Sequence, residues 1–237
     1  MRFARIHPPL AASLLLSAVP WMSACTAPAE ESVKPGINAE YFKPDLDVAQ
    51  WTERFEREGR EIYDHRERIA DSAGVRPGQR VADIGAGTGL FTGLLASRTG
   101  PSGKVIAVDI VPEFLARIAE RAQRDGLRNV ETVLCTERSV ELPTASIDLA
   151  FICDAYHHFE FPRSTLATLH RALAAGGELV VIDFERVPGQ SSEWVLGHVR
   201  APRETFVAEI EAAGFELLEV QDWLKDNYIT RFRKVGR

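Results

Sequence analysis

The chain has 237 residues, of which 45% are hydrophobic, and its formal net charge is −6. This length favours one domain with an appendage, and the apolar fraction is ordinary for a globular protein. The acidic excess argues against a nucleic-acid partner, because such partners attract basic surfaces.

The first residues predict an export signal. Basic residues precede a short apolar run, Leu10 to Val19, which is too short to span a bilayer as a stable anchor. The run is followed by Met22-Ser23-Ala24-Cys25, which resembles the lipobox of bacterial lipoproteins, although Met22 stands where that motif usually has Leu. The resemblance implies a signal peptide over 1–24, lipid on Cys25, and a periplasm-facing protein anchored in the bacterial cell envelope. An ordinary cleavable signal is the alternative.

Two segments of different character follow. Residues 25–46 are rich in Ala, Pro, Glu and Ser and predict a solvated tether. Residues 47–73 predict one or two helices, since Asp47 can cap a helix and Trp51, Phe55 and Ile62 fall near one face. We expect this helical cap to open a domain over 47–237.

A glycine-rich stretch, residues 80–91, is the strongest motif in the chain. Val81 and Ile84 suit a buried strand, and Gly85, Gly87 and Gly89 allow backbone approaches that a Cβ would block. Helical spacing resumes at Leu90, so a ligand would meet bare backbone at a helix N-terminus. The dinucleotide fingerprint G-x-G-x-x-G places its third glycine one residue later, which argues against an NAD-dependent oxidoreductase.

A second anchor is the β-branched strand 104–110, which ends in Asp109. An acid at that strand end is placed to accept hydrogen bonds from both hydroxyls of a ribose. Together the two stretches predict a nucleoside-binding α/β fold.

The remaining elements alternate between strand and helix. Pro112 opens a helix as a first-turn proline should. Further strands are predicted at 130–135, 146–154, 178–183, 215–220 and 227–233, with helices after Pro162 and over 202–213 and a linker over 190–201. This order predicts a doubly wound sheet of seven strands with one antiparallel member.

The Asp83-x-Gly-x-Gly-x-Gly run resembles motif I of the class I S-adenosylmethionine (SAM) methyltransferases. The adjacent histidines after the fourth strand extend the resemblance to the type 11 branch, over about residues 75–185. The resemblance implies a seven-stranded Rossmann-like methyltransferase sheet with SAM as cofactor. An acid near the turn suits SAM, which carries an amino group and a sulfonium in place of a pyrophosphate. The cofactor-binding residues implied are Asp83, Gly85, Ala86, Gly87, Gly89, Asp109, Ile110, Glu137 and Asp154.

Residues after the fourth strand are candidates for catalysis on the acceptor side: Asp154, Tyr156 and His157. A general base is needed only if the acceptor is protonated, and a hydrogen-bonded structural histidine is the alternative for His157. We predict no metal site, because adjacent histidines on one turn rarely converge on an ion without further ligands. The Asn-Pro-Pro-aromatic signature of DNA adenine and protein glutamine methyltransferases is absent here, which favours a small-molecule or lipid acceptor.

Three alternatives stay open. A non-catalytic SAM- or nucleoside-binding envelope lipoprotein would show the same motifs. Arg60, Tyr63 and Arg66 of the cap either face the cofactor's carboxylate or form a salt-bridged solvent face. Cys135 and Cys153 are either small buried hydrophobes or a disulfide, and their spacing fits no zinc pattern.

Overall fold

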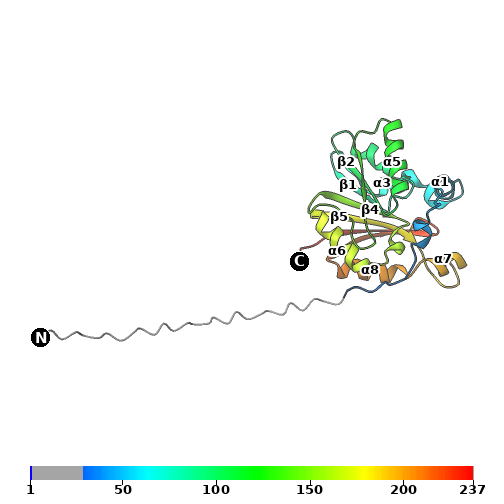
Figure 1. Ribbon diagram of the computed structural model, residues 1–237. Helices are drawn as coiled ribbons and strands as arrows, with labels where there is room; N and C mark the ends of the chain where they lie inside the picture. The colour runs from blue at the N-terminus through cyan, green and yellow to red at the C-terminus, as the bar shows by residue number, and fades with distance from the viewer. Residues whose placement is uncertain (2–28, 237) are drawn as a thin grey trace.

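The computed structural model describes Met1 and residues 29–236 (Figure 1). The predicted signal peptide and Cys25 therefore lie outside the described residues. Among the described helices, none is long and apolar enough to cross a membrane.

One seven-stranded sheet forms the centre of the molecule, in the order β3-β2-β1-β4-β5-β7-β6. Strands β1 to β5 are joined by parallel pairings, and β7 runs antiparallel to both β5 and β6. This arrangement confirms the predicted doubly wound, Rossmann-like sheet. The strands are β1 (Arg80–Ile84), β2 (Lys104–Asp109), β3 (Val130–Leu134), β4 (Ile147–Cys153), β5 (Leu173–Phe184), β6 (Phe215–Gln221) and β7 (Asn227–Lys234).

Helices cover both faces of the sheet, and side chains alternate between two cores. Val81 and Phe151 face the core that includes Ile69 and Leu95, whereas Ala82 and Ile152 face the core of α6 and α8. The helical elements are η1 (Ala39–Phe42), α1 (Val48–Phe55), α2 (Glu61–Asp64), α3 (Arg66–Ser72), α4 (Thr92–Thr99), α5 (Pro112–Arg124), η2 (Tyr156–His158), α6 (Pro162–Ala172), α7 (Glu193–His198) and α8 (Arg203–Ala212).

Two elements differ from the prediction. The cap consists of three short helices instead of one or two, because the chain turns between Phe55 and Glu61, where Gly59 has φ +83°. The predicted linker over 190–201 contains α7. Ser192 caps this helix, since its side chain accepts a hydrogen bond from the Val195 N–H.

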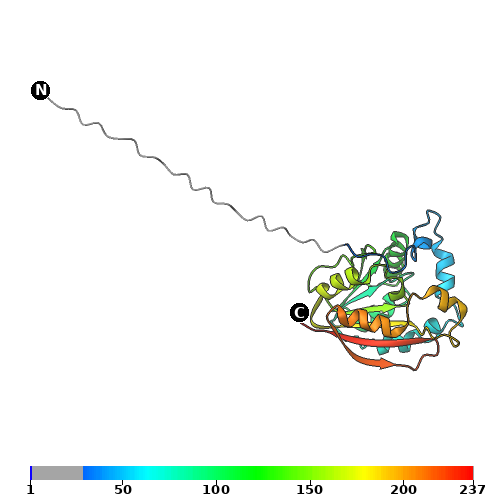
Figure 2. The same cartoon turned by 90° about the horizontal axis from the view of Figure 1, so that it is seen from below.

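The described part of the predicted tether packs against the domain. The Val33 N–H donates to the Glu160 carbonyl at 3.0 Å, and Lys34 Nζ donates to the carbonyls of Gly197 and His198 at the end of α7. Asn38 is buried. The expectation of a solvated tether is therefore wrong for residues 32–38, whose polar groups find partners on the domain. In Figure 2, α1 (cyan) and α7 (gold) lie on the same side of the molecule.

Candidate functional site

A cavity of 690 Å³ opens at the carboxyl ends of β1, β2 and β4. This volume lies within the range of small-molecule sites. Asp83 and Asp109, which the sequence places at two strand ends, both line it. Ala86, Ile110 and Glu137 line it as well, so most of the predicted cofactor-binding residues meet in one cavity.

The three glycines of the turn after β1 have different roles. All have positive φ, at +68° for Gly85, +54° for Gly87 and +84° for Gly89. A Cβ on Gly85 would lie 2.5 Å from the Ala155 Cβ, so that glycine is required by close packing. A Cβ on Gly87 would lie 3.7 Å from its nearest neighbour, an atom of the Phe55 ring, so its backbone is open to the cavity.

Gly89 is predicted to bind the cofactor, but the structure gives it a role in packing. A Cβ there would lie 2.7 Å from Cγ1 of Ile118 on α5, and Gly89 is not among the described residues that line the cavity. Its missing side chain therefore lets the chain pack against α5.

Asp109 presents a partly free carboxylate to the cavity. Its Oδ2 accepts a hydrogen bond from the Gly87 N–H at 2.8 Å, and its Oδ1 accepts one from the Val111 N–H at 2.9 Å. A carboxylate has about four lone-pair sites, so acceptor capacity remains for ligand hydroxyls. Burial raises the pKa of Asp109 to about 6, against the lowering effect of these backbone donors.

Asp83 is bonded to the helix that follows the turn. Its Oδ2 accepts a hydrogen bond from Thr92 Oγ1 at 2.7 Å, which joins the end of β1 to the start of α4. Burial raises the pKa of Asp83 to about 7. The hydrogen bond from Thr92 opposes this shift. Asp83 thus ties the strand end to α4, whereas Asp109 is held by backbone donors of the glycine turn and of the segment after β2.

Asp154 forms a charged group with the cap. It has φ +49°, forms an ion pair with Arg60, and accepts a hydrogen bond from Asn227 Nδ2 at 2.7 Å. Burial raises the pKa of Asp154 to about 6, and the Arg60 guanidinium opposes the rise. Arg60 and Asp154 both line the cavity, whereas Tyr63 and Arg66 lie outside the described lining. One alternative for Arg60 was a salt bridge on a solvent face. The structure contains a salt bridge of Arg60, but this salt bridge lies inside the cavity.

An aromatic wall closes the cavity on the cap side. Tyr41, Trp51 and Phe55 pack in sequence, with ring centroids 4.9 Å and 5.2 Å apart. Glu56 fastens this wall over the glycine turn, because its carboxylate accepts hydrogen bonds from Thr88 Oγ1 at 2.8 Å and from Arg121. The cap therefore covers this side of the cavity.

Tyr156 is predicted to act on the acceptor side, but it lies in the core of the protein. Its side chain is fully buried, its ring packs against Phe159 and Phe206, and its hydroxyl donates to Glu209 at 3.0 Å. The tight turn η2 sends successive side chains to different sides, so Tyr156 enters the core and His157 faces the cavity. Tyr156 is therefore not an acceptor-side group.

His157 is fixed by a carboxylate that sequence reasoning left without a role. Its backbone N–H donates to Asp183 Oδ2 at 3.0 Å, and its ring Nδ1 lies 2.8 Å from Asp183 Oδ1. An ionised carboxylate only accepts, so Nδ1 donates to Asp183 and Nε2 is the ring nitrogen that Asp183 leaves free for another partner. Asp183 ends β5, and that strand-end position was the available signal for its role.

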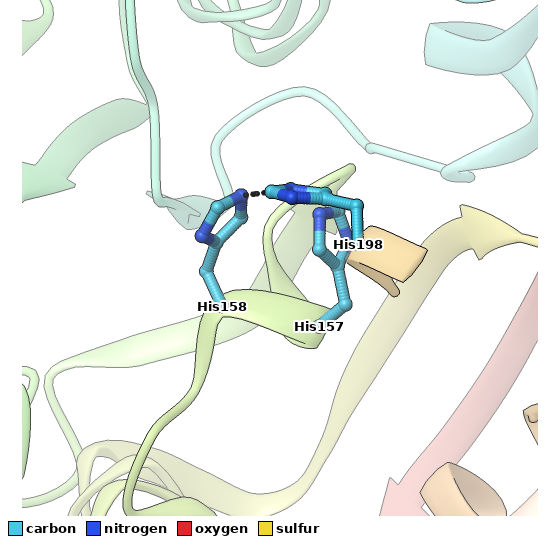
Figure 3. A group of neighbouring side chains, drawn as sticks. All are labelled: His157, His158 and His198. Carbon is cyan, nitrogen blue, oxygen red and sulfur yellow. Dashed lines mark hydrogen bonds between the residues drawn. The ribbon is translucent and has the colours of Figure 1, made fainter. Parts of the chain in front are cut away.

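Two further histidines adjoin His157 (Figure 3). His158 Nδ1 lies 3.2 Å from Asn38 Oδ1, and His158 Nε2 lies 3.3 Å from Nε2 of His198. Burial lowers the pKa of His158 to about 2 and that of His198 to about 4, and neighbouring His157 adds to both shifts. Both rings are therefore neutral at pH 7. Sequence reasoning missed His198 because it predicted no helix there, although Ser192 before an acidic residue was a helix-start signal.

The two cysteines in the described part of the chain form no disulfide. Cys135 and Cys153 are free, partly buried and part of the cavity lining within residues 29–236. Burial raises the pKa of both thiols, that of Cys135 to about 12, so they act as small hydrophobic groups.

Comparison with solved structures identifies the fold. The fold is that of class I SAM-dependent methyltransferases. A SAM-dependent methyltransferase from Aquifex aeolicus superposes with a TM-score of 0.70 at 24% identity, over 81% of this chain and 100% of that one. The [4+2]-cyclase SpnF superposes with a TM-score of 0.67 at 20% identity, over 88% of this chain and 98% of that one.

The sequence similarity to known proteins covers a shorter part of the chain than the structural superpositions do. Residues 82–181 match the family described as "Methyltransferase domain". The ubiquinone/menaquinone biosynthesis C-methyltransferase UbiE of Bordetella parapertussis is 35% identical over 115 residues, 48% of this chain and 44% of that protein. The UbiE of Ectopseudomonas mendocina is 34% identical over 118 residues, 49% of this chain and 46% of that protein. The chain thus spans less than half the length of these relatives.

Proposed function

We propose that the chain is a SAM-dependent methyltransferase that acts on a small-molecule or lipid acceptor. One observation carries the proposal: a single cavity holds the open Gly87 backbone and Asp109 together with His157 and Asp154. A ligand bound along the first pair would face the second pair. Methyl transfer requires this kind of placement, since the enzyme mainly has to align two reactants and exclude water.

The residues present fit SAM. The Gly87 backbone leaves a space that a Cβ would fill, and Asp109 keeps acceptor capacity for two ribose hydroxyls. The carboxylates of Asp109 and Asp154 favour a cationic ligand and would oppose a pyrophosphate. SAM, when bound, supplies an electrophilic methyl group. The glycine turn orients the cofactor, and the cap excludes water from it.

The acceptor half of the cavity is aromatic. Phe184 and Trp194 line it beside His157, and their rings pack 5.5 Å apart. We propose His157 and Asp154 as the groups that contact the acceptor. The names of the UbiE relatives point to quinone biosynthesis, so a flat aromatic acceptor is the class that we would test first.

The proposal extends to the location of the protein. The lipobox-like run ending in Cys25 supports export and lipid attachment to the bacterial cell envelope, facing the periplasm. The test is fractionation of cells that produce the full chain. We expect the protein in the membrane fraction and a Cys25→Ser variant in the soluble fraction. Equal distribution of the two would overturn the anchor without touching the enzyme proposal.

Calorimetry with the purified full chain tests the cofactor. We expect SAM and S-adenosylhomocysteine to bind, and an Asp109→Ala variant to lose that binding. Absence of binding at millimolar ligand would overturn the proposal. Radiolabelled methyl transfer to envelope extracts then tests catalysis. Binding without transfer to any extract would favour the alternative, a non-catalytic SAM-binding envelope protein.

A further inference from the structure

Three imidazoles meet at the acceptor end of the cavity. His157 and His158 come from η2 and His198 comes from the end of α7, and one ring nitrogen of each lies within 4.8 Å of the others (Figure 3). All three residues line the cavity. The cluster therefore joins two segments that are far apart in sequence.

Hydrogen bonds outside the cluster fix which nitrogens can act as ligands. Asn38 Nδ2 donates to Glu137 Oε1 and to the His158 carbonyl, so Asn38 Oδ1 is an acceptor. His158 must then carry its proton on Nδ1, which points at Asn38 Oδ1, and its Nε2 has a free lone pair. Asp183 likewise accepts from Nδ1 of His157, which leaves Nε2 as the ligand atom of that ring. In two of the three rings, outer hydrogen bonds thus engage Nδ1 and leave Nε2 available as a ligand atom.

The third ring completes the cluster. Because His158 Nε2 is an acceptor, the proton between the two rings lies on His198 Nε2. The separation of 3.3 Å is also the distance expected between two ligands of one zinc ion. Zn–N bonds of about 2.0–2.1 Å at tetrahedral angles place two nitrogens roughly 3.3–3.4 Å apart. The ligand atoms of all three rings lie within 4.8 Å of one another, so the rings need to close by at most about 1.5 Å to reach this spacing.

We propose that His157, His158 and His198 bind one divalent transition-metal ion, with the fourth coordination position open to the cavity. Three imidazoles with an open position are the ligand set of many zinc sites, and imidazole suits zinc better than it suits calcium or magnesium. Asp183 behind His157 and Asn38 behind His158 are the outer partners that such ligands ordinarily have. Metal binding moves the His198 proton from Nε2 to Nδ1, and both forms of the ring are neutral.

The surroundings define the ligand for the open position. The Asp183 carboxylate offsets part of the ion's charge, and Lys34 and Arg54 add positive charge near the cluster. A water molecule or an anionic oxygen is therefore the class of fourth ligand that this end of the cavity favours. The ion site itself does not depend on the proposed methyl transfer.

Zinc binding to the chelator-treated full chain tests the proposal. We expect one equivalent of Zn²⁺ to bind in competition with a chromophoric chelator. His198→Ala and His158→Ala are each expected to lower the affinity at least about 100-fold. His170→Ala is the matched control, because His170 bonds the Val235 carbonyl away from the cavity, and it is expected to retain full affinity. Cobalt(II) bound at the same site should show tetrahedral absorption without a thiolate band.

Three results would overturn the site. These are less than one equivalent of bound zinc, equal affinities for His198→Ala and His170→Ala, or a thiolate band that disappears in a Cys135→Ser/Cys153→Ser variant. Unfolding midpoints of each variant show whether a loss of affinity reflects loss of the fold, and His198→Asn serves if His198→Ala is unstable. SAM binding is measured on the same metal-free samples, so failure of the metal site and failure of the proposed function are separable.

Discussion

Asp183 Oδ1 lies 2.8 Å from Nδ1 of His157, and Asp183 Oδ2 accepts the His157 backbone N–H at 3.0 Å. One buried carboxylate thus fixes both the main chain and the ring of the same histidine. The Phe184 N–H also donates to Asp183 Oδ1. This carboxylate decides which ring nitrogen of His157 faces the cavity, whatever that nitrogen then binds.

Replacing Asp183 by Asn should disturb that ring. The new amide places an N–H₂ group opposite an existing donor, which costs about 1–3 kcal/mol of the free energy of unfolding. We expect a lower denaturant midpoint and a mixture of His157 tautomers in nitrogen NMR spectra. Asp226→Asn, on the exposed side of the β6–β7 turn, is the control. An unchanged tautomer in Asp183→Asn would contradict this role.

The buried carboxylates predict how stability depends on pH. Burial raises the pKa of Asp83 from its ordinary 3.8 to about 7, so above pH 4 the folded chain keeps a proton that the unfolded chain releases. The free energy of unfolding should therefore fall as pH rises from about 4 to about 7, by about 1.4 kcal/mol for each unit of pKa difference. Asp109 and Asp154 contribute in the same direction up to about pH 6.

Urea unfolding at intervals from pH 5 to pH 8 measures this slope. Asp83→Asn should flatten it, because the amide cannot titrate. Asp125→Asn, which alters an exposed carboxylate at the end of α5, should leave it unchanged. If the free energy of unfolding of Asp83→Asn falls with pH as steeply as that of the unmodified chain, Asp83 does not cause the pH dependence.

Two glycines of the turn after β1 should respond differently to substitution, because one packs against a helix and the other faces the cavity. Gly89→Ala should cost about 1–3 kcal/mol of the free energy of unfolding, because its Cβ would strike Ile118 and its φ is positive. Gly87→Ala should cost about 1–2 kcal/mol for its positive φ and should also weaken SAM binding, since its Cβ enters the cavity. Thermal unfolding and calorimetry on both variants give the comparison. The prediction fails if Gly89→Ala loses more affinity than Gly87→Ala after correction for the folded fraction.

Local pattern was enough to predict the sheet and the cofactor half of the site. Strand β2 carries the β-branched residues Val105, Ile106 and Val108 in its buried stretch, and the Asp83–Gly89 run combines a strand end with a glycine turn shortly before α4. Such features depend on near neighbours. The place of Asp109 in the site could be predicted in the same way, because parallel strands have their carboxyl ends at one edge of the sheet.

The acceptor half depends on contacts between distant residues. His198 lies on a six-residue helix that contains Gly197, too short and too weak in helix propensity to stand out from a linker. Asn38 sits in a polar segment whose composition resembles a tether, and only docking onto Glu137 and His158 gives it a role. The side chain of Tyr156 points into the core because of the tight turn η2. The spacing of residues along the chain does not predict the direction of a side chain in such a turn.

The pair Arg60 and Asp154 gives a last prediction, because Arg60 holds down the pKa of a buried acid. Arg60→Met removes the charge but keeps much of the volume, so the pKa of Asp154 should rise above about 6. SAM affinity should then require a higher pH than in the unmodified chain, because a protonated Asp154 attracts a cation less. Calorimetry across pH 5 to 8 measures the shift. Arg66→Met, outside the cavity lining, is the matched control.

A double variant assigns the effect to the correct carboxylate. Asp109 also has a pKa of about 6 and also lines the cavity, so part of any pH profile belongs to it. Arg60→Met combined with Asp154→Asn should return the profile to that of Asp154→Asn alone, since no carboxylate remains for Arg60 to act on. A shift that persists in the double variant would show that Arg60 acts elsewhere, for example through its 2.8 Å hydrogen bond to the Phe55 carbonyl in the cap.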